Sequence, residues 1–346
     1  MTKICSITIT SDRHLIIRDA LESVKNHVDK FLFVDLGIDP VTMAVIGEVC
    51  GNNTAFTACS DQLSMGGIRN RGLALAASQG MEWAIQLDTD ERIVFPNNFI
   101  EILNNSDIDV FSSIHKSGRY SKERVFRIPA KANFVGHIHE QWNGTQPALM
   151  QGLVFDELPK SEETITKNLV SMVSGLKQQM ADEPDNYRWS FQLALCYRAM
   201  DDPCGAIGLL QRALLSGATG ATHAWICYTV AMCYMDLFDT NAAMEWCLKG
   251  LGRHPGLSEL SHLAGVCCLK MGRAQEAMCW ANMAISNGLF YGSSFAENRT
   301  GHREPYALWD GPFELQRDAM KAMGYPEEAI TESDNIMQEA RKRRHQ

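Results

Sequence analysis

The sequence lacks the excess of positive charge that a nucleic-acid-binding protein needs. Its 346 residues carry a formal net charge of -9 at pH 7, and 21% of them are charged. Because this composition supplies no broad basic surface, general binding to nucleic acids is not expected. A basic run at residues 341–345 is the exception. It is most simply a solvated chain end, and contact with an anionic polymer or a membrane surface is the alternative.

Long apolar runs and closely spaced cysteine pairs are also missing. No apolar stretch reaches the roughly 18 residues that cross a bilayer, so no transmembrane segment is predicted. The 11 cysteines are an odd number without a Cys-x-x-Cys pair, and several, such as Cys196 and Cys233, occupy apolar helical positions. We interpret them as small buried hydrophobes in a reducing compartment. The chain begins with a strand pattern and not with a secretory signal, so a cytoplasmic location is expected.

Strand-length apolar segments alternate with amphipathic helical segments over the first part of the chain. Strands are predicted at residues 4–10, 30–35, 55–58 and 83–87, with helices at 15–27, 41–50 and 68–79. This alternation is typical of a mostly parallel sheet with helices on both faces. Two further segments, 109–114 and 125–128, are expected to form an antiparallel extension of that sheet.

One predicted strand, residues 83–87, ends in two carboxylates. Asp88 and Asp90 follow it, one residue apart. On an extended backbone, residues i and i+2 point to the same side, so both carboxylates would point to one place beyond the strand. Ligands of open α/β sheets usually bind there. Two hard oxygen ligands suit Mg²⁺ or Mn²⁺, which in turn suits a diphosphate. A solvated Asp-rich turn is the simpler alternative.

A second cluster of chemically active side chains lies at His137, His139 and Glu140. If residues 134–139 form a strand, the two histidines share one face and Glu140 opposes them. An edge strand with ordinary polar residues explains the same pattern, because the spacing fixes no third ligand.

From residue 164 onward the sequence is helical and repeats itself. The small residues Ala194, Ala231 and Gly265 lie 37 and 34 residues apart. Small residues where paired helices touch, at a period near 34, are typical of tetratricopeptide repeats. We therefore predict an α/β domain at residues 1–160 and a helical-repeat domain at 161–346.

A weaker fourth repeat contains Gly324 and has Arg317 at the small-residue position, so it is irregular or a cap. The segment 289–311 before it is too long for a repeat turn. Loops of this length are often functional, and a packing excursion around Trp309 is the alternative.

These motifs, taken in order, resemble family-2 glycosyltransferases of the GT-A fold. The resemblance rests on the segments 4–10, 20–24, 28–37, 69–72, 87–91 and 136–140. The bacterial and phage subgroup with a tetratricopeptide tail, which includes lipopolysaccharide-core glucosyltransferases and peptide S-glycosyltransferases, is the most similar. The resemblance implies a GT-A domain followed by helical repeats. It also implies a metal-dependent, inverting transfer of a sugar from a nucleotide-diphosphate sugar, with a UDP-sugar favoured.

On the donor side, the resemblance implies that the first-strand turn at Thr10 and Ser11, together with Asp35, holds the nucleoside. Arg69 would lie near the diphosphate or the base. The usual turn after the second strand contains a hydroxyl that this chain lacks, although the acid at Asp35 is present.

On the catalytic side, Asp88 and Asp90 would hold the Mn²⁺ or Mg²⁺ ion that offsets charge on the leaving diphosphate. Glu140 would be the general base on the acceptor, with His139 orienting it or contacting the acceptor. Many relatives carry a histidine just before the helical tail. This chain has Asp156 and Glu157 in that region, and either is a candidate substitute for the missing metal ligand.

The leading functional hypothesis is therefore a glycosyltransferase whose repeats recruit a glycan, lipid-linked or peptide acceptor, or mediate dimerisation. The alternative from another class is a tetratricopeptide scaffold, a binding protein with a degenerate, non-catalytic transferase domain. A nucleotidyltransferase, which would release pyrophosphate, is a third possibility.

Overall fold

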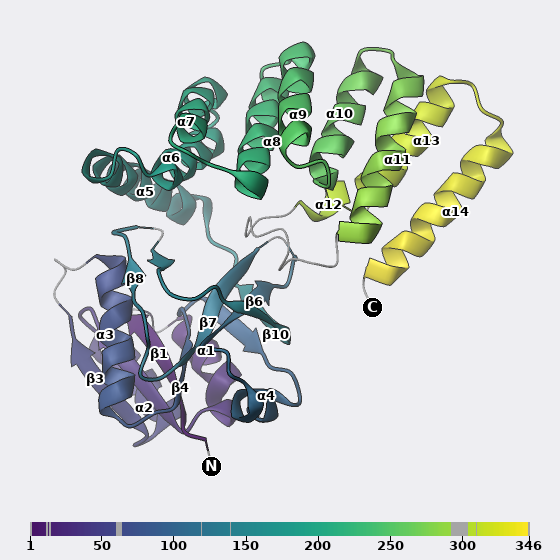
Figure 1. Cartoon of the computed structure of the whole chain (residues 1–346). Coiled ribbons are helices and arrows are strands. Elements are labelled where there is room, and N and C mark those ends of the chain that lie inside the picture. The colour runs from purple at the N-terminus through teal and green to yellow at the C-terminus, as the bar shows by residue number, and fades with distance from the viewer. Residues whose placement is uncertain are drawn as a thin grey trace. The chain divides into compact units, whose positions relative to one another are not determined.

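The computed structural model describes residues 2–11, 13, 15–59, 64–118, 120–138, 140–291, 304–308 and 310–344. Contacts divide the chain into two compact units, Met1–Ile165 and Thr166–Gln346. The first is an α/β unit and the second is helical (Figure 1).

An eight-stranded sheet forms the α/β unit, and a two-stranded ribbon accompanies it. The ribbon pairs β8 (Phe134–Val135) with β9 (Gln141–Trp142). In spatial order the sheet consists of β3 (Thr54–Ala58), β2 (Lys30–Asp35), β1 (Ile4–Thr10), β4 (Trp83–Gln86), β7 (Ser121–Arg127), β6 (Val110–His115), β10 (Ala148–Glu157) and β5 (Glu91–Val94).

The prediction of a mostly parallel sheet is wrong. The strands β3, β2, β1 and β4 run parallel, as helical crossovers require. The antiparallel extension predicted from residues 109–114 and 125–128 is confirmed, because β7 is antiparallel to both β4 and β6. In addition, β5 is antiparallel to β10. A short turn joins β6 to β7, so these two strands form a hairpin and not a crossover unit. The later strands thus complete one mixed sheet.

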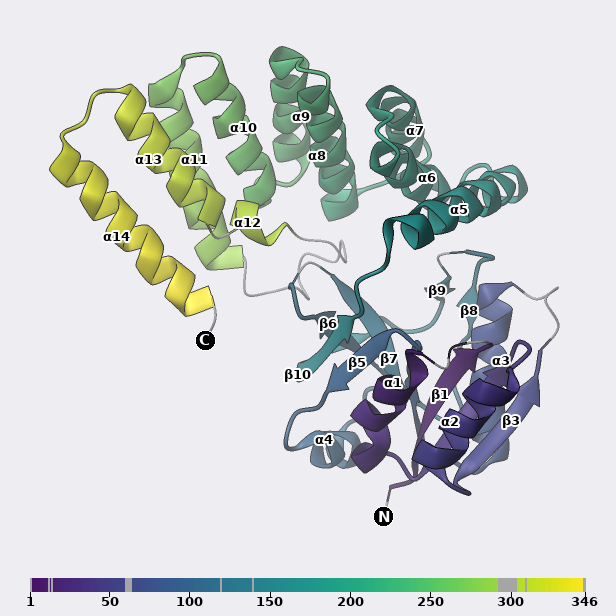
Figure 2. The ribbon, with the colours of Figure 1, turned by 180° about the vertical axis from the view of Figure 1, so that it is seen from behind.

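Helices cover both faces of the sheet (Figures 1 and 2). On one face α1 (Ile17–Val24), α2 (Pro40–Cys50) and α4 (Phe99–Asn105) enclose an apolar core, and α3 (Met65–Ser78) packs on the other face. The helix α3 lies close to β1 because Gly72 has no side chain: an added Cβ would lie 2.4 Å from Ile7 Cγ2. This packing carries Arg69, one turn earlier in α3, toward the carboxyl ends of β1 and β4.

Antiparallel helix pairs make up the helical unit. In chain order the helices are α5 (Glu162–Asp182), α6 (Tyr187–Ala199), α7 (Pro203–Leu215), α8 (Gly220–Asp236), α9 (Thr240–Arg253), α10 (Ser258–Lys270), α11 (Ala274–Tyr291), α12 (Pro305–Leu308), α13 (Asp310–Ala322) and α14 (Glu327–Arg344). The predicted helical repeats are confirmed: α6 packs on α7, α8 on α9, and α10 on α11. The small residues Ala194 and Ala231 are fully buried where helices touch.

The fourth pair, α13 and α14, departs from the repeat pattern at the position predicted from sequence. Arg317 takes the place of a small residue and forms ion pairs with Asp318 and Asp334. Most of the segment 289–311, including Trp309, lies outside the described residues. Within the part of the chain that the structure describes, no helix is both long and apolar enough to cross a membrane.

Candidate functional site

Four carboxylates and three cations of the α/β unit form one connected network of ion pairs, which we call the charged cluster. Its members are Arg69 of α3, Asp88 after β4, Glu91 of β5, Lys122 and Arg124 of β7, Glu140 before β9, and Glu157 of β10. Five segments that are distant in sequence therefore converge on the place where the sequence predicts a donor and metal site.

Asp88 has both of its carboxylate oxygens engaged by guanidinium groups. Arg69 Nη1 and Nη2 each donate to Oδ1 at 3.3 Å, and Arg124 Nη2 donates to Oδ2 at 3.1 Å. Burial alone would raise the pKa of Asp88, but Arg69 and Arg124 hold it well below its usual range. The carboxylate is thus ionised and neutralised by the protein itself.

Asp90 pairs with a different cation, Lys160, whose Nζ lies 3.1 Å from Oδ2. Burial lowers the pKa of Lys160, but Asp90 raises it above its ordinary value overall. The strand β4 ends at Gln86, and the Glu91 amide donates to the Asp88 carbonyl across a turn at 3.0 Å. The extended backbone predicted for the two acids is therefore wrong.

These residues do not fit a divalent cation in their observed arrangement. Asp88 and Asp90 are held by cations, and a metal ion between them would lie beside two guanidinium groups and an ammonium group. Among the described residues, no three His, Cys, Asp or Glu side chains are grouped so that they could hold a metal. His139 lies outside the described residues.

The two substitutes considered for the missing metal ligand are also paired. Asp156 forms an ion pair with Lys116. Glu157 accepts from Lys122 and, at 3.0 Å, from the Tyr120 hydroxyl. Burial would raise the pKa of Glu157, but Lys122 lowers it.

The most deeply buried ion pair joins Arg124 to Glu91, whose side chains are 3% and 0% exposed. Glu91 Oε1 also accepts from Lys122 Nζ at 2.9 Å, and the Arg124 guanidinium lies 5.4 Å from the centre of the Phe155 ring. Sequence reasoning missed this pair because the predicted strand began at Val125. The available signal was the period of two in an extended strand: if the strand is extended backward from Val125, Lys122 and Arg124 lie on one face.

Glu140 reaches the charged cluster because α3 holds the segment before it. The Asn70 side chain donates to the Phe134 carbonyl at 2.9 Å and accepts from its amide at 2.7 Å. The first amides of α3, those of Met65 and Gly66, donate to the carbonyls of His137 and Gly136 at 3.1 Å. The helix N-terminus, which elsewhere binds anions, is thus occupied by the chain's own carbonyls.

Arg69 Nε donates to Glu140 Oε1. Burial would raise the pKa of Glu140, but Arg69 lowers it. A general base works best with a pKa near the operating pH, so this environment does not favour proton abstraction by Glu140.

The residues expected around a nucleoside lie at the ends of β1 and β2. Asp35 Oδ1 accepts from the amides of Gly37 and Ile38 at 2.8 Å, which closes the turn after β2. Thr10 is buried at the end of β1, and Ser11 follows it. Among the described residues, Thr10 Oγ1 and Gln86 Nε2 are buried without a hydrogen-bond partner. Buried polar atoms seldom remain unpaired.

The helical unit has a second candidate site, which we call the turn edge: the turns that join α6 to α7, α8 to α9, α10 to α11 and α13 to α14. The α8–α9 and α10–α11 turns lie at the same end of the unit (Figures 1 and 2). Arg198 Nε lies 3.1 Å from Asp236 Oδ2, which joins the last turns of α6 and α8. The Cys267 thiol contacts Met235 Sδ at 3.7 Å, which joins α8 to α10.

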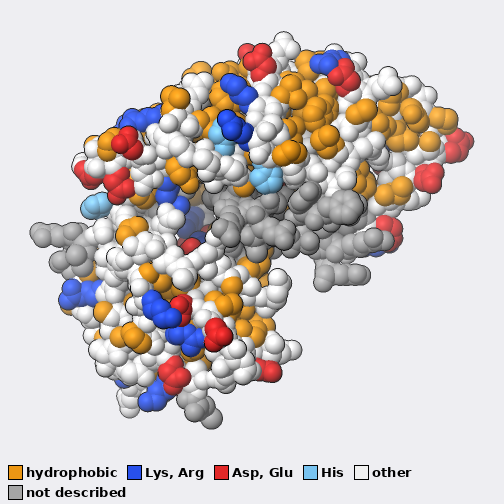
Figure 3. Space-filling model, in the orientation of Figure 1, with side chains coloured by type: hydrophobic (Ala, Val, Ile, Leu, Met, Phe, Trp, Pro, Cys, Tyr) orange, Lys and Arg blue, Asp and Glu red, His pale blue; other side chains and the backbone are white. Residues whose placement is uncertain are grey.

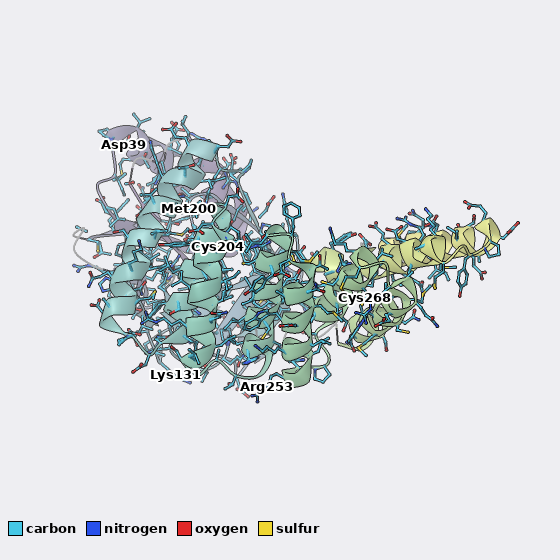
Figure 4. All side chains as sticks on the ribbon, turned by 90° about the horizontal axis from the view of Figure 1, so that it is seen from above. Asp39, Lys131, Met200, Cys204, Arg253 and Cys268 are labelled. Atoms are coloured by element: carbon cyan, nitrogen blue, oxygen red, sulfur yellow. The ribbon has the colours of Figure 1, made fainter. Side chains whose placement is uncertain are left out.

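Large apolar side chains are exposed along this edge. Met200 and Leu237 cap α6 and α8, and both are exposed, as is Tyr325 in the α13–α14 turn. Figure 4 shows Met200 near Cys204, at the beginning of α7. Figure 3 shows hydrophobic side chains gathered on the surface over α8, α9 and α10.

Phe238 is the extreme case. Its side chain is 91% exposed, and its φ is 60°. The corresponding residues are Asp201, Gly272 and Gly324, which also have positive φ values. A residue with a Cβ in the left-handed region costs about 1–2 kcal/mol, and glycine avoids this cost. Phe238 is therefore unfavourable both for its backbone and for its exposure to water.

Comparisons with known proteins give no match to a family model and none to a curated protein. Solved structures of helical-repeat proteins are similar over part of the chain. The MamA protein is 13% identical, with a TM-score of 0.40, over 53% of this chain and 88% of MamA. YrrB, a TPR protein with an unusual peptide-binding site, is 15% identical, with a TM-score of 0.32, over 46% and 84%. The TPR2B domain of yeast Sti1, solved in complex with pHsp70, is 10% identical, with a TM-score of 0.32, over 39% and 97%.

The identification as a family-2 glycosyltransferase with a GT-A fold is therefore wrong. No family model and no curated protein supports it. The physical reason lies in the charged cluster, where the acid pair that supported the identification is neutralised by Arg69, Arg124 and Lys160.

Proposed function

We propose that the protein is a helical-repeat binding protein that holds a polypeptide partner at its turn edge. The observation that carries this proposal is Phe238. For folding alone, glycine would suit this position, as at Gly272, and a polar side chain would suit the exposure. Aromatic side chains, phenylalanine among them, are enriched at protein interfaces. A partner that covers Phe238 accounts for both unfavourable features.

Under this proposal the α/β unit is degenerate and non-catalytic, as the scaffold hypothesis from the sequence expects. Its acids and cations stabilise one another inside the fold. We also propose a reducing location such as the cytoplasm, because all 11 cysteines are free and most are buried.

The test is a photo-crosslink from the turn edge. A benzoylphenylalanine at position 238 should crosslink a polypeptide in cells, and the same group at position 215 should not crosslink it. Leu215 is a matched control because it is 88% exposed and ends α7, away from the turn edge. The identified partner should then bind the purified wild-type protein and lose at least tenfold in affinity with Phe238→Gly. Equal crosslinking from both positions would refute the proposal.

A second candidate function is transfer of a sugar from a nucleotide-diphosphate sugar, with a UDP-sugar as the favoured donor. The specific observation that favours it is the pair of buried, unpartnered atoms Thr10 Oγ1 and Gln86 Nε2 among the described residues at the strand ends. Mn²⁺ or Mg²⁺ at Asp88 and Asp90 would require Arg69, Arg124 and Lys160 to leave these carboxylates.

Thermal unfolding with UDP-sugars, with and without Mn²⁺, tests this second candidate. A ligand at a hundredfold excess over its dissociation constant stabilises the native state by about 2.7 kcal/mol. A metal-dependent rise in the wild-type midpoint that is absent in Asp88→Asn would support it. A flat response across the sugars leaves the binding protein as the function.

A further inference from the structure

Resting on the proposed function, we infer that the segment held at the turn edge is basic. The occupant is a stretch of a partner polypeptide that places a large apolar side chain between lysine or arginine residues. The apolar side chain would cover Phe238 and Met200, and the cations would face the acids beside them.

The acids that flank these two apolar residues form one group. Asp201, Asp202, Asp236 and Asp239 are all exposed and lie in or next to the first two turns of the edge. Arg198 lies among them and, within the described residues, forms its ion pair with Asp236. This part of the edge therefore has a surplus of negative charge, in contrast to the paired charges of the α/β unit.

Two of these acids lie where helix electrostatics disfavour them. Asp236 is the last residue of α8, and Asp201 follows the cap of α6. The carboxyl end of a helix carries partial negative charge, so an acid there destabilises the helix by a fraction of a kcal/mol. Asp201 also has a φ of 60°, where asparagine or glycine fits as well and carries no charge. The ion pair with Arg198 accounts for Asp236 within the fold. Asp201 has no ion pair among the described residues, and a basic partner would supply one.

The other two acids have a local role that does not require their charge. Asp202 accepts from the Gly205 amide at 2.8 Å, and Asp239 accepts from the Ala242 amide at 3.0 Å. Asparagine caps a helix about as well as aspartate. A change of Asp239 to asparagine therefore removes a charge and keeps the cap.

The third turn limits where the acidic surface lies. Lys270 and Arg273 flank Gly272, and Arg273 pairs with Glu276. The negative surplus of the two turns that expose Met200 and Phe238 thus does not continue into the third turn. Apolar contact and charge complementarity coincide in those two turns, and this coincidence supports one basic, apolar-anchored segment as the occupant.

Fluorescence anisotropy with two labelled peptides tests the inference on the full-length protein. One peptide alternates leucine with lysine, and the other alternates leucine with glutamate. We expect the wild type to bind the lysine peptide and not the glutamate peptide, with affinity that falls as salt rises. The double variant Asp201→Asn with Asp239→Asn should bind the lysine peptide about tenfold more weakly, because it removes two negative charges that face the lysine side chains.

The matched control is Asp182→Asn with Asp185→Asn. It makes the same change in net charge near the beginning of α6, at the end opposite the turn edge, and should bind the peptide as the wild type does. Equal loss in both double variants, or equal binding of the two peptides, would overturn the inference.

The outcomes also separate this inference from the proposed function. If a crosslinked partner depends on Phe238 but is indifferent to the two asparagine changes, the turn edge binds a partner that is not basic. If Phe238→Gly alters neither partner binding nor peptide binding, the turn edge is not the binding site, and both conclusions fail.

Discussion

The charged cluster and the turn edge differ in whether energetically unfavourable groups find partners within the fold. In the α/β unit, Arg124 and Glu91 are charges taken almost completely out of water, and each meets an opposite charge. In the helical unit, Phe238 is an apolar group left almost completely in water. The buried charges are paired within the fold, whereas the exposed apolar side chain is not covered by it.

This difference shows why conspicuous chemistry is a poor guide to function here. Carboxylates one residue apart draw attention in a sequence, but their environment decides what they can do. Asp88 faces two guanidinium groups that already neutralise it. A single exposed phenylalanine in a helical turn draws no attention until its backbone and its exposure are known.

The largest expected effect comes from breaking the buried ion pair with Arg124→Met. Glu91 would keep Lys122 as a partner but lose the guanidinium in a fully buried site. Removing one partner of a buried ion pair typically costs about 3–5 kcal/mol. We expect this loss in the α/β unit alone, measured by hydrogen exchange at β4 and β7, with the helical repeats unchanged.

Two further variants sharpen this prediction. Lys131→Met removes an exposed cation that pairs with Asp109, and it should change stability by less than about 0.5 kcal/mol. Combining Arg124→Met with Glu91→Gln removes both charges and should recover part of the loss. If Arg124→Met behaves like Lys131→Met, the charged cluster does not stabilise the unit.

Acid should weaken the α/β unit more than the repeats. Burial would raise the pKa values of Asp88 and Glu140, but Arg69 brings both below the ordinary carboxyl value of about 4. Such groups contribute stability that is fully present above the unfolded pKa and is lost as pH falls through the folded pKa. Hydrogen exchange between pH 7 and pH 3 should therefore show β4 losing protection below about pH 4.

Arg69→Met should flatten this dependence, because it removes the cation that lowers both pKa values. The variant should be less stable than the wild type at pH 7 and closer to it at pH 3. A wild-type unit whose protection is constant down to pH 3 would contradict the assignment.

Much of the fold was predictable from sequence, because its signals are local. Strand β1 and the small residues Ala194 and Ala231 lie where alternation and repeat spacing place them. The antiparallel extension by residues 109–114 and 125–128 was also predicted, whereas the pairing of β5 with β10 was not. The chain returns after Asp90 so that β5 pairs with β10, whose residues follow more than 50 positions later. No local pattern encodes such a partner.

The candidate sites show the same limit. The structure brings Arg69, Asp88 and Glu140, all named from the sequence, into direct contact. Sequence spacing did not reveal that Arg124 would join them, and its presence changes the chemistry from metal binding to charge neutralisation. Phe238 was missed because positive φ at a repeat turn becomes visible only when the turns are aligned in space.

The smallest expected effect tests the turn edge through stability alone. Phe238→Gly removes a large side chain from a left-handed backbone position, which costs a residue with a Cβ about 1–2 kcal/mol. Part of this gain in stability is offset, because glycine has more conformational freedom than phenylalanine in the unfolded chain. We expect a net gain of about 1 kcal/mol in the repeats, measured by urea unfolding, while Leu215→Ser changes stability by less than about 0.5 kcal/mol. A substitution that makes the repeats more stable but lowers the affinity for the partner would show that Phe238 serves binding at the expense of folding stability. A loss of stability would mean that Phe238 packs in the native state, and its exposure would no longer support a binding site.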